Sequence, residues 1–266
     1  MPIKIITSPT IEPVTLGEVK AHTNWPVDED DPLLNLYISA ARAYAEKITG
    51  GAFITQTVEY VLDSWPSGDV LYLPKPPLQS VTSIKYYGAD GTEYTLDPTD
   101  YIVDTDSFPG RISLAYGKTW PSITLQPVNG IRIRFAAGHP VYAGTVDTNG
   151  TAVTWKTGDK FNVNWPASYS ITINNTLYSV ASVTSTEALT LQKTAGEQEG
   201  AAYMASDVPL NIKQALFLLV ALQYAVREPI LIGRAGNMVN PLINTASADV
   251  LLTQDRAFWG EHWNDN

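Results

Sequence analysis

The stretch at residues 13–57, PVTLGEVKAHTNWPVDEDDPLLNLYISAARAYAEKITGGAFITQT, carries the start and end signals of two helices and leads into a β region. Thr15 and Glu18 have the spacing of a capping box, in which each side chain satisfies a free backbone N–H group at a helix start. Asp31, which precedes a proline, is a typical beginning for the second helix, and Gly50 is a typical end. The stretch therefore predicts a short helix, an acidic turn and a longer amphipathic helix.

Short β segments occupy most of residues 53–137. Their boundaries are marked by turn residues, and the run YGADGT at 87–92 has the chemistry of a hairpin connection. The prolines of LPKPPL at 73–78 cannot donate to a sheet ladder, so this run leaves the sheet or follows its edge. We predict strands at 57–62, 70–73, 81–87, 93–96, 101–104, 111–114 and 131–136.

The segment 140–206 differs in composition from the rest of the chain. It is rich in Thr, Val, Asn, Ser and Gly, lacks helical periodicity, and is too long for a simple connection. Tight-turn signals at Asn149-Gly150 and Asn174-Asn175 favour a small barrel or sandwich. We predict strands at 152–155, 160–163, 170–173, 177–183 and 188–191, which together form an inserted all-β domain.

The predicted fold class is therefore α+β, a body of about four helices with a short-stranded β region and the inserted domain. The predicted domains are 1–139, 140–206 and 207–266. The helix that follows Pro209 is apolar on almost every side, so it must be buried on more than one side. That burial could be entirely internal, or one side could pack on a neighbouring subunit. Candidate contacts between subunits are Leu218, Leu222, Tyr37 and Tyr44.

Several classes of site are absent from the sequence. The chain has no cysteine, which excludes a disulfide framework, a thiolate metal site and a cysteine nucleophile. His22, His139 and His262 lie far apart and lack metal-binding spacing. The acidic run 28–31 lacks the spacing of a calcium loop and precedes a helix start, where carboxylates stabilise the helix dipole. We expect no catalytic residue, no metal site and no cofactor.

The net charge of −10 argues against a surface that grips nucleic acid, because phosphate contacts need clustered Lys and Arg. Arg132 and Arg134 alternate on one predicted strand, a pattern more typical of a solvated face. The beginning of the chain does not read as a signal peptide, and the densest apolar run, 215–222, is far too short to cross a bilayer. We expect a protein made in the cytoplasm that does not bind membranes.

Several runs, taken in their order along the chain, resemble the head-tail connector (adaptor) proteins of long-tailed bacteriophages and of related gene transfer agents. They include the apolar helix after Pro209. The others are PVTLGEVKAH (13–22), DDPLLNLYISAARAYAEKITG (30–50), ITQT (54–57), LPKPPLQSVTSIKYY (73–87), DYIVDT (100–105), PGRISLAYGKTWP (109–121) and IRIRFAAG (131–138). The inserted segment departs from the usual connector pattern.

This resemblance implies a structural virion protein of the neck, which joins the capsid to the tail as a twelve-subunit homo-oligomeric ring at the portal vertex. The implied partners are other copies of the chain, the portal protein, a head-completion (stopper) or tail protein, and DNA that passes through the lumen without specific binding. In such connectors the C-terminal segment reaches the portal. Phe258, Trp259 and Trp263 are therefore candidate portal anchors, with packing on the chain's own core as the alternative.

The inserted domain leaves a second function open, that of a virion surface protein that binds a host glycan or receptor. Aromatic side chains can stack on the apolar faces of sugar rings, and the segment has several of them. In a small β domain, however, large aromatic residues more often form the core. The aromatic residues concerned are Trp155, Trp165, Tyr169, Tyr178 and Tyr203.

Overall fold

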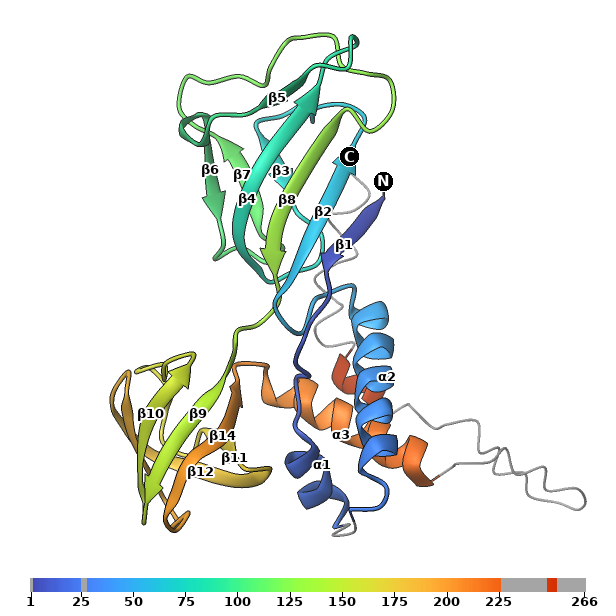
Figure 1. The fold of residues 1–266 in the computed structure, drawn as a ribbon. Helices are drawn as coiled ribbons and strands as arrows, with labels where there is room; N and C mark the ends of the chain where they lie inside the picture. Colours follow the sequence, from blue (N-terminus) through green and yellow to red (C-terminus); the bar gives the residue numbers. More distant parts are fainter. Residues whose placement is uncertain (1, 25–27, 226–247, 253–266) are drawn as a thin grey trace, which may run out of the picture. The chain divides into compact units, whose positions relative to one another are not determined.

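The computed structural model describes residues 2–24, 28–225 and 248–252, and the chain divides into two compact units (Figure 1). The first unit comprises Met1–Ile11, Glu46–His139 and Thr253–Asn266, and the second comprises Glu12–Ala45 and Pro140–Leu252. Each unit therefore combines segments that are distant in sequence. Whether 1–139, 140–206 and 207–266 fold as separate domains stays a prediction.

The first unit is a sandwich of two antiparallel sheets. One sheet has the order β1 (Ile3–Thr7), β2 (Gln56–Leu62), β8 (Ile131–Ala137), β4 (Leu78–Tyr87) and β5 (Glu93–Thr95). The other has the order β3 (Val70–Tyr72), β7 (Arg111–Leu114) and β6 (Tyr101–Asp104), the last of which follows the short 3-10 helix η1 (Pro98–Asp100).

The core of this unit lies between the two sheets. Alternate residues of the larger sheet, such as Val58, Ile84 and Ile133, point inward and meet Leu71 and Ile112 of the smaller sheet. This follows from the period of two in a strand, which places every second side chain on the same face. The proline-rich run 74–77 leaves the sheet before β4 begins, and the turn between β4 and β5 forms the predicted hairpin.

The helices of the second unit begin and end where the sequence indicates. In α1 (Leu16–Thr23), the backbone N–H of Glu18 donates to Thr15 Oγ1 at 3.0 Å, and the N–H of Thr15 donates to Glu18 Oε2 at 2.7 Å, which completes the capping box. Helix α2 (Asp31–Thr49) ends at Gly50, whose φ of 73° is strained for any residue with a side chain.

The inserted domain is a closed six-stranded barrel. Its strands, in the order in which they neighbour one another, are β10 (Ala152–Gly158), β13 (Ala188–Leu191), β12 (Thr176–Ser185), β11 (Ser170–Ile173), β14 (Gln198–Ser206) and β9 (Val141–Asn149). β9 and β14, the first and last strands, pair with each other and close the barrel. The chain then continues into α3 (Leu210–Ala225), and residues 248–252 are helical.

The fold class is confirmed, an α+β chain with an inserted β domain, but some strand predictions were wrong. Residues 160–163 form no strand: Phe161 is buried in the barrel core from a loop, where its N–H donates to the carbonyl of Thr186. Three strands, β1, β9 and β14, were not predicted. Phe161 and Val163 alternate as the residues of a strand would, but Phe161 is buried and Val163 is 53% exposed.

Candidate interaction surfaces

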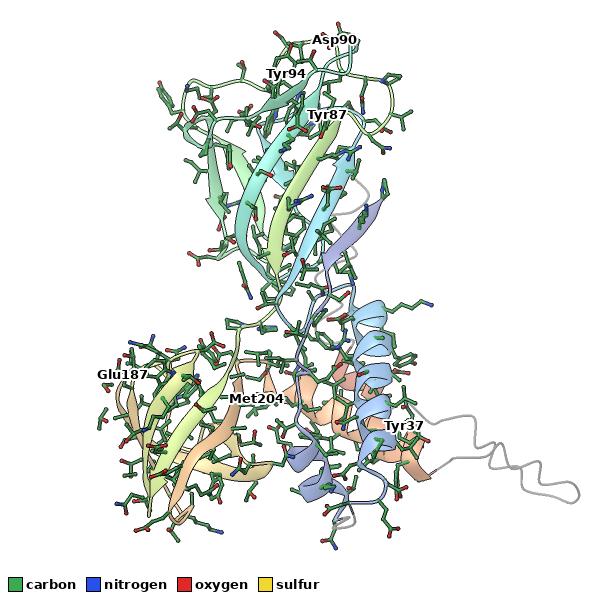
Figure 2. All side chains as sticks on the ribbon, in the orientation of Figure 1. Tyr37, Tyr87, Asp90, Tyr94, Glu187 and Met204 are labelled. Atoms are coloured by element: carbon green, nitrogen blue, oxygen red, sulfur yellow. The ribbon has the colours of Figure 1, made fainter. Side chains whose placement is uncertain are left out.

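Helix α2 has apolar residues on two sides. Leu34, Ile38 and Ala41 recur at helical spacing and are fully buried. On another side, Leu36 is 62% exposed, Tyr44 is exposed, and Tyr37, which is labelled in Figure 2, is half-buried. Ala40 and Ala43 are exposed beside them. We call Leu36, Tyr37, Ala40, Ala43 and Tyr44 the outer face of α2.

Helix α3 is likewise buried on one side and partly open on the other. Leu216, Leu219 and Val220 are buried, whereas the candidates Leu218 and Leu222 are half-buried and Leu210 is 78% exposed. Leu218 and Leu222 lie one helical turn apart, beside the buried face of the helix. The helix is thus not fully buried within the described residues, and its open side combines the apolar Leu210 and Ala225 with the polar Gln214.

A buried ion pair joins α1 to α3. Lys213 Nζ lies 3.3 Å from Glu18 Oε1, and the two side chains are only 7% and 8% exposed. The same carboxylate accepts the N–H of Thr15 through its other oxygen. Glu18 therefore both caps α1 and compensates the one charge that α3 buries. Next to this pair, the ring of Phe217 stacks on His22 at a centroid distance of 5.2 Å.

Helix α1 also approaches the barrel closely at the turn between β11 and β12. A Cβ atom placed on Gly17 would lie 1.8 Å from the carbonyl oxygen of Asn175. Asn174 and Asn175 both have positive φ, as a tight two-residue hairpin requires. A glycine is therefore needed on the helix side of this contact, and α1 and the barrel turn are in van der Waals contact.

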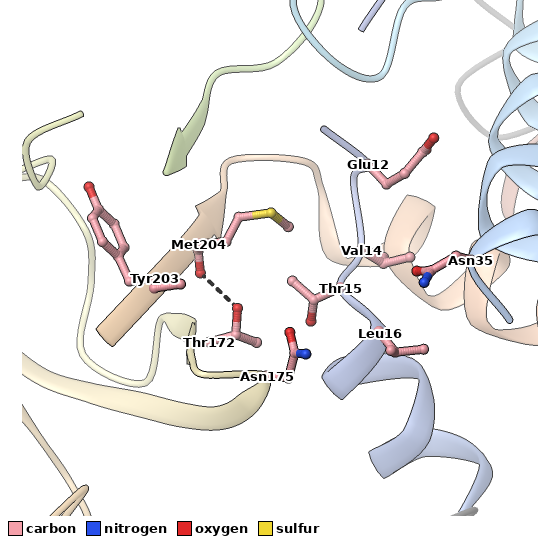
Figure 3. Close-up of a pocket in the computed structure, with 10 residues that line it drawn as sticks. Glu12, Val14, Thr15, Leu16, Asn35, Thr172, Asn175, Tyr203 and Met204 are labelled. Carbon is pink, nitrogen blue, oxygen red and sulfur yellow. Dashed lines mark hydrogen bonds between the residues drawn. The ribbon is translucent and has the colours of Figure 1, made fainter. Parts of the chain in front are cut away.

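A pocket of about 340 Å³ opens beside this contact (Figure 3). Its lining includes Glu12, Thr15 and Asn35 on the helical side and Asn175 and Met204 on the barrel side. The carboxylate of Glu12 binds the Arg42 guanidinium at 2.7 Å, and Thr15 belongs to the capping box. The polar groups that could orient a ligand are thus largely engaged within the chain.

Asp207 organises the base of the barrel, where the chain enters and leaves it. Its carboxylate accepts hydrogen bonds from Tyr169 Oη at 2.6 Å, Trp165 Nε1 at 3.1 Å and Tyr142 Oη at 3.1 Å. Burial raises the pKa of Tyr169, and the hydrogen bond to Asp207 raises it further. The backbone N–H of Asp207 donates to the carbonyl of Pro140 at 3.0 Å.

The barrel aromatics do not form an exposed platform. Trp165 and Tyr203 are buried in the core, and Trp155, Tyr169 and Tyr178 pack against it. Trp165 and Tyr169 stack face to face at 4.6 Å. The core interpretation therefore matches the positions of Trp165 and Tyr203, and the other three rings are partly buried against that core.

The charged groups of the helical region bind one another. Lys20 Nζ contacts Asp28 at 2.6 Å and Asp31 at 2.5 Å, and the hydrogen bonds that Lys20 donates to these carboxylates raise its pKa. The hydroxyl of Tyr224 donates to Asp30 at 2.5 Å. The acidic run thus binds a lysine and a tyrosine. In the described part of the chain, no group of three or more His, Asp or Glu side chains could hold a metal ion.

The outer face of the larger sheet is similarly balanced. Arg134 contacts Glu59 at 3.1 Å, Lys85 contacts Glu93 at 2.6 Å, and the Arg132 guanidinium lies 5.1 Å from the centre of the Tyr87 ring. The two arginines noted in the sequence therefore belong to a mixed-charge face. No described helix is long and apolar enough to cross a membrane.

Some of the predicted residues fall outside the described part. Phe258, Trp259 and Trp263 lie there, as does His262. The sequence analysis missed Asp207 and the pair formed by Glu18 and Lys213. A lone lysine in an otherwise apolar helix was a usable signal, because a buried ammonium group needs an anionic partner.

The comparisons with known proteins agree with this architecture. Residues 13–87 match the family model described as phage gp6-like head-tail connector protein. The resemblance found in the sequence is thereby confirmed over this segment, which contains the helix pair and the first strands of the sheet. No curated protein matches the chain.

Three solved structures share the fold. A chain in the neck of an empty gene transfer agent (GTA) particle, with C6 symmetry, is 21% identical with a TM-score of 0.57. A chain in the virion of a native GTA particle is 19% identical, TM-score 0.56, and one in the neck of a native GTA particle, with C12 symmetry, is 20% identical, TM-score 0.52. Each match covers 96% of this chain and 95% of the other, so it cannot leave out the barrel.

Proposed function

We propose that this chain is a structural protein of a virion neck that assembles as a homo-oligomeric ring and joins capsid to tail, because residues 13–87 match the family model of the phage gp6-like head-tail connector protein. The likeness in fold to chains from GTA necks supports this proposal, and two of those necks have C6 or C12 symmetry. A twelve-subunit ring against a portal is the arrangement we propose here.

The observation that carries the ring is the outer face of α2. This face groups apolar side chains, with Leu36 62% exposed, and exposed apolar patches mark interaction sites. On α3, Leu218 and Leu222 are half-buried and so also leave apolar surface open. A neighbouring copy that covers these residues would remove them from water, at roughly 25 cal/mol for each Å² buried.

DNA in the lumen would encounter an acidic ring. Each chain has a formal net charge of −10, and Lys85, Arg132 and Arg134 of the outer sheet face already contact carboxylates or an aromatic ring. Such a surface does not release counterions from the phosphate backbone, so it binds DNA weakly. We propose that DNA passes through the ring without being held.

The ring is tested with Leu36→Asp, compared with Leu177→Asp, a matched change at an exposed leucine of the barrel. An unpaired charge buried at an interface costs several kcal/mol, so the first variant should lose assembly while both keep the wild-type melting temperature. Leu218→Asp and Leu222→Asp should break either assembly or the fold. Size is measured by light scattering and electron microscopy with the portal present, and a wild-type chain that stays monomeric there contradicts the proposal.

The portal anchors are tested by truncation after Asp255. Tryptophan and other aromatic residues are enriched in interface hot spots, so removal of Phe258, Trp259 and Trp263 should abolish portal binding. An unchanged melting temperature with lost binding supports the anchor role. A large drop in melting temperature would instead place these residues in the chain's own core.

The barrel is peripheral to docking in this proposal. Replacement of residues 141–206 by a Gly-Ser linker should leave a body that folds and binds the portal, because the chain enters and leaves the barrel at one place. The lost contact between Gly17 and Asn175 should lower stability without preventing folding. Collapse of the body would show that the barrel is integral.

The alternative function, glycan or receptor binding through the barrel, has no observation of its own in this structure. Binding of the full chain to cells or to glycan arrays would support this alternative function.

A further inference from the structure

We propose that neighbouring copies of this chain join through the two open edges of the larger sheet, with β1 of one copy pairing in parallel with β5 of the next. The inference rests on the proposed ring and specifies one of its contacts. It concerns only the first unit, in which both edges lie (Figure 1).

Strand β1 is an unprotected apolar edge. All five of its residues are exposed, including Ile3 at 39%, Ile5 at 46% and Ile6, and its only charge is Lys4. It pairs with β2 on one side and with no other described strand. Edges of this kind invite pairing with another chain unless charges, prolines or bulges prevent it, and the irregularity here comes only after Ile5.

The register shows which backbone groups face outward. The N–H of Val61 donates to the carbonyl of Pro2, so the carbonyl of Pro2 faces β2. Because the pattern repeats every two residues, the N–H and carbonyl of Lys4 also face β2. Ile3 and Ile5 therefore direct theirs to the open side. Their side chains lie on the core face of the sheet, since they are opposite the buried Tyr60 and Val58.

Strand β5, at the other edge, has a matching set of outward-facing backbone groups. The N–H of Leu96 donates to Ile84 and that of Gly88 to Thr92, so the groups that face outward are those of Glu93 and Thr95. Between them lies Tyr94, which is exposed, is opposite Tyr86 and is therefore on the core face.

The strand directions and the faces on which the side chains lie both fit a pairing of β1 with β5. A sheet of five strands that are all antiparallel has its two edge strands running the same way, so joining edges between copies related by rotation gives a parallel pair. In a parallel pair, one residue bonds to the two that flank the residue opposite it. Ile3 opposite Tyr94 would thus donate to Glu93 and accept from Thr95, with both side chains on the core face.

A second copy suits these edges better than another protein. One chain carries both complementary edges on opposite sides of one sheet, which is what a head-to-tail contact that closes into a ring requires. The pairing would also cover Ile3 and Ile5. The barrel takes no part, because its strands are closed on one another.

The test uses paired cysteines in the full-length chain, which has none of its own. Ile3→Cys with Tyr94→Cys should give a ladder of cross-linked multimers under oxidation, because opposite residues of adjacent strands lie within disulfide reach. Ile3→Cys with Glu93→Cys is the matched control. It should not cross-link, because Glu93 points to the other face. Ile5→Pro, which removes an outward N–H, should weaken assembly severalfold and leave the melting temperature unchanged.

The outcomes separate this inference from the proposed function. Rings visible by electron microscopy without the ladder overturn the edge pairing and leave the ring standing. Equal cross-linking by the control pair, or dimers of Ile3→Cys alone, also overturn it, since the second result indicates that β1 pairs with itself. A chain that stays monomeric with the portal present overturns both proposals.

Discussion

Removal of Lys213 should destabilise the second unit strongly. The Lys213→Met substitution keeps the length and apolar stem of the side chain but leaves the Glu18 carboxylate, 8% exposed, without its cation. Removing one partner of a buried pair typically costs about 3–5 kcal/mol. Glu18 still accepts the hydrogen bond from the N–H of Thr15, so we expect a cost at the low end of this range, about 3 kcal/mol.

The matched variants isolate the charge. Glu18→Gln combined with Lys213→Met removes both charges and keeps a side chain that can complete the capping box, so much of the loss should be recovered. Lys160→Met breaks a surface pair in which both side chains are about half exposed, and should cost about 1 kcal/mol or less.

Calorimetry and hydrogen exchange measure the effect. A loss of about 3 kcal/mol lowers the melting temperature of a domain of this size by roughly 6–12 °C. The exchange of the Val19 amide, which donates to Thr15 within α1, reports local opening of that helix. Wild-type stability in Lys213→Met, or a double variant no better than the single one, would refute a stabilising role for the buried pair.

Three further predictions concern other contacts. Asp207→Ala leaves three aromatic donors without their acceptor, and each unsatisfied group costs about 1–3 kcal/mol, so the barrel should melt earlier and its tryptophan fluorescence should change. Gly17→Val places a side chain on the Asn175 carbonyl and should displace α1 from the barrel turn, seen as faster exchange in α1. Hydrogen bonds from Ser107 and the Arg111 guanidinium lower the pKa of Asp104 from 3.8 to about 2. The ionised Asp104 therefore contributes to folding stability above pH 3.8, and this contribution is lost as the pH falls through 2. A carboxyl titration by NMR that gives an ordinary pKa for Asp104 would contradict that.

The helix boundaries were predictable because their signals are local. The capping box at Thr15 and the stop at Gly50 act within one helical turn, so no distant contact has to be known. The strands of the first unit were found for a similar reason, since alternation and turn residues mark them. Strand β1 was missed because its five exposed residues do not alternate.

The remaining features depend on contacts distant in sequence. Phe161 looks like part of a strand and fills the barrel core from a loop instead. Asp207 gained its three hydrogen bonds only when the barrel brought residues 142, 165 and 169 to its base. Periodicity showed that α3 is apolar all round, yet it could not tell which side the chain itself would cover, because burial is decided by tertiary packing.

The pairing of β9 with β14 determines how the barrel would respond to force. Because the chain enters at Val141 and leaves at Ser206, which are opposite each other in this pair, tension between the two ends loads the ladder one bond at a time from the base. A pair pulled from its opposite ends would load all its bonds at once and resist more. The hydrogen bonds at Asp207 sit at the point where this peeling starts. They therefore set the force at which the barrel would open, while the strands further from the base contribute little to its mechanical strength.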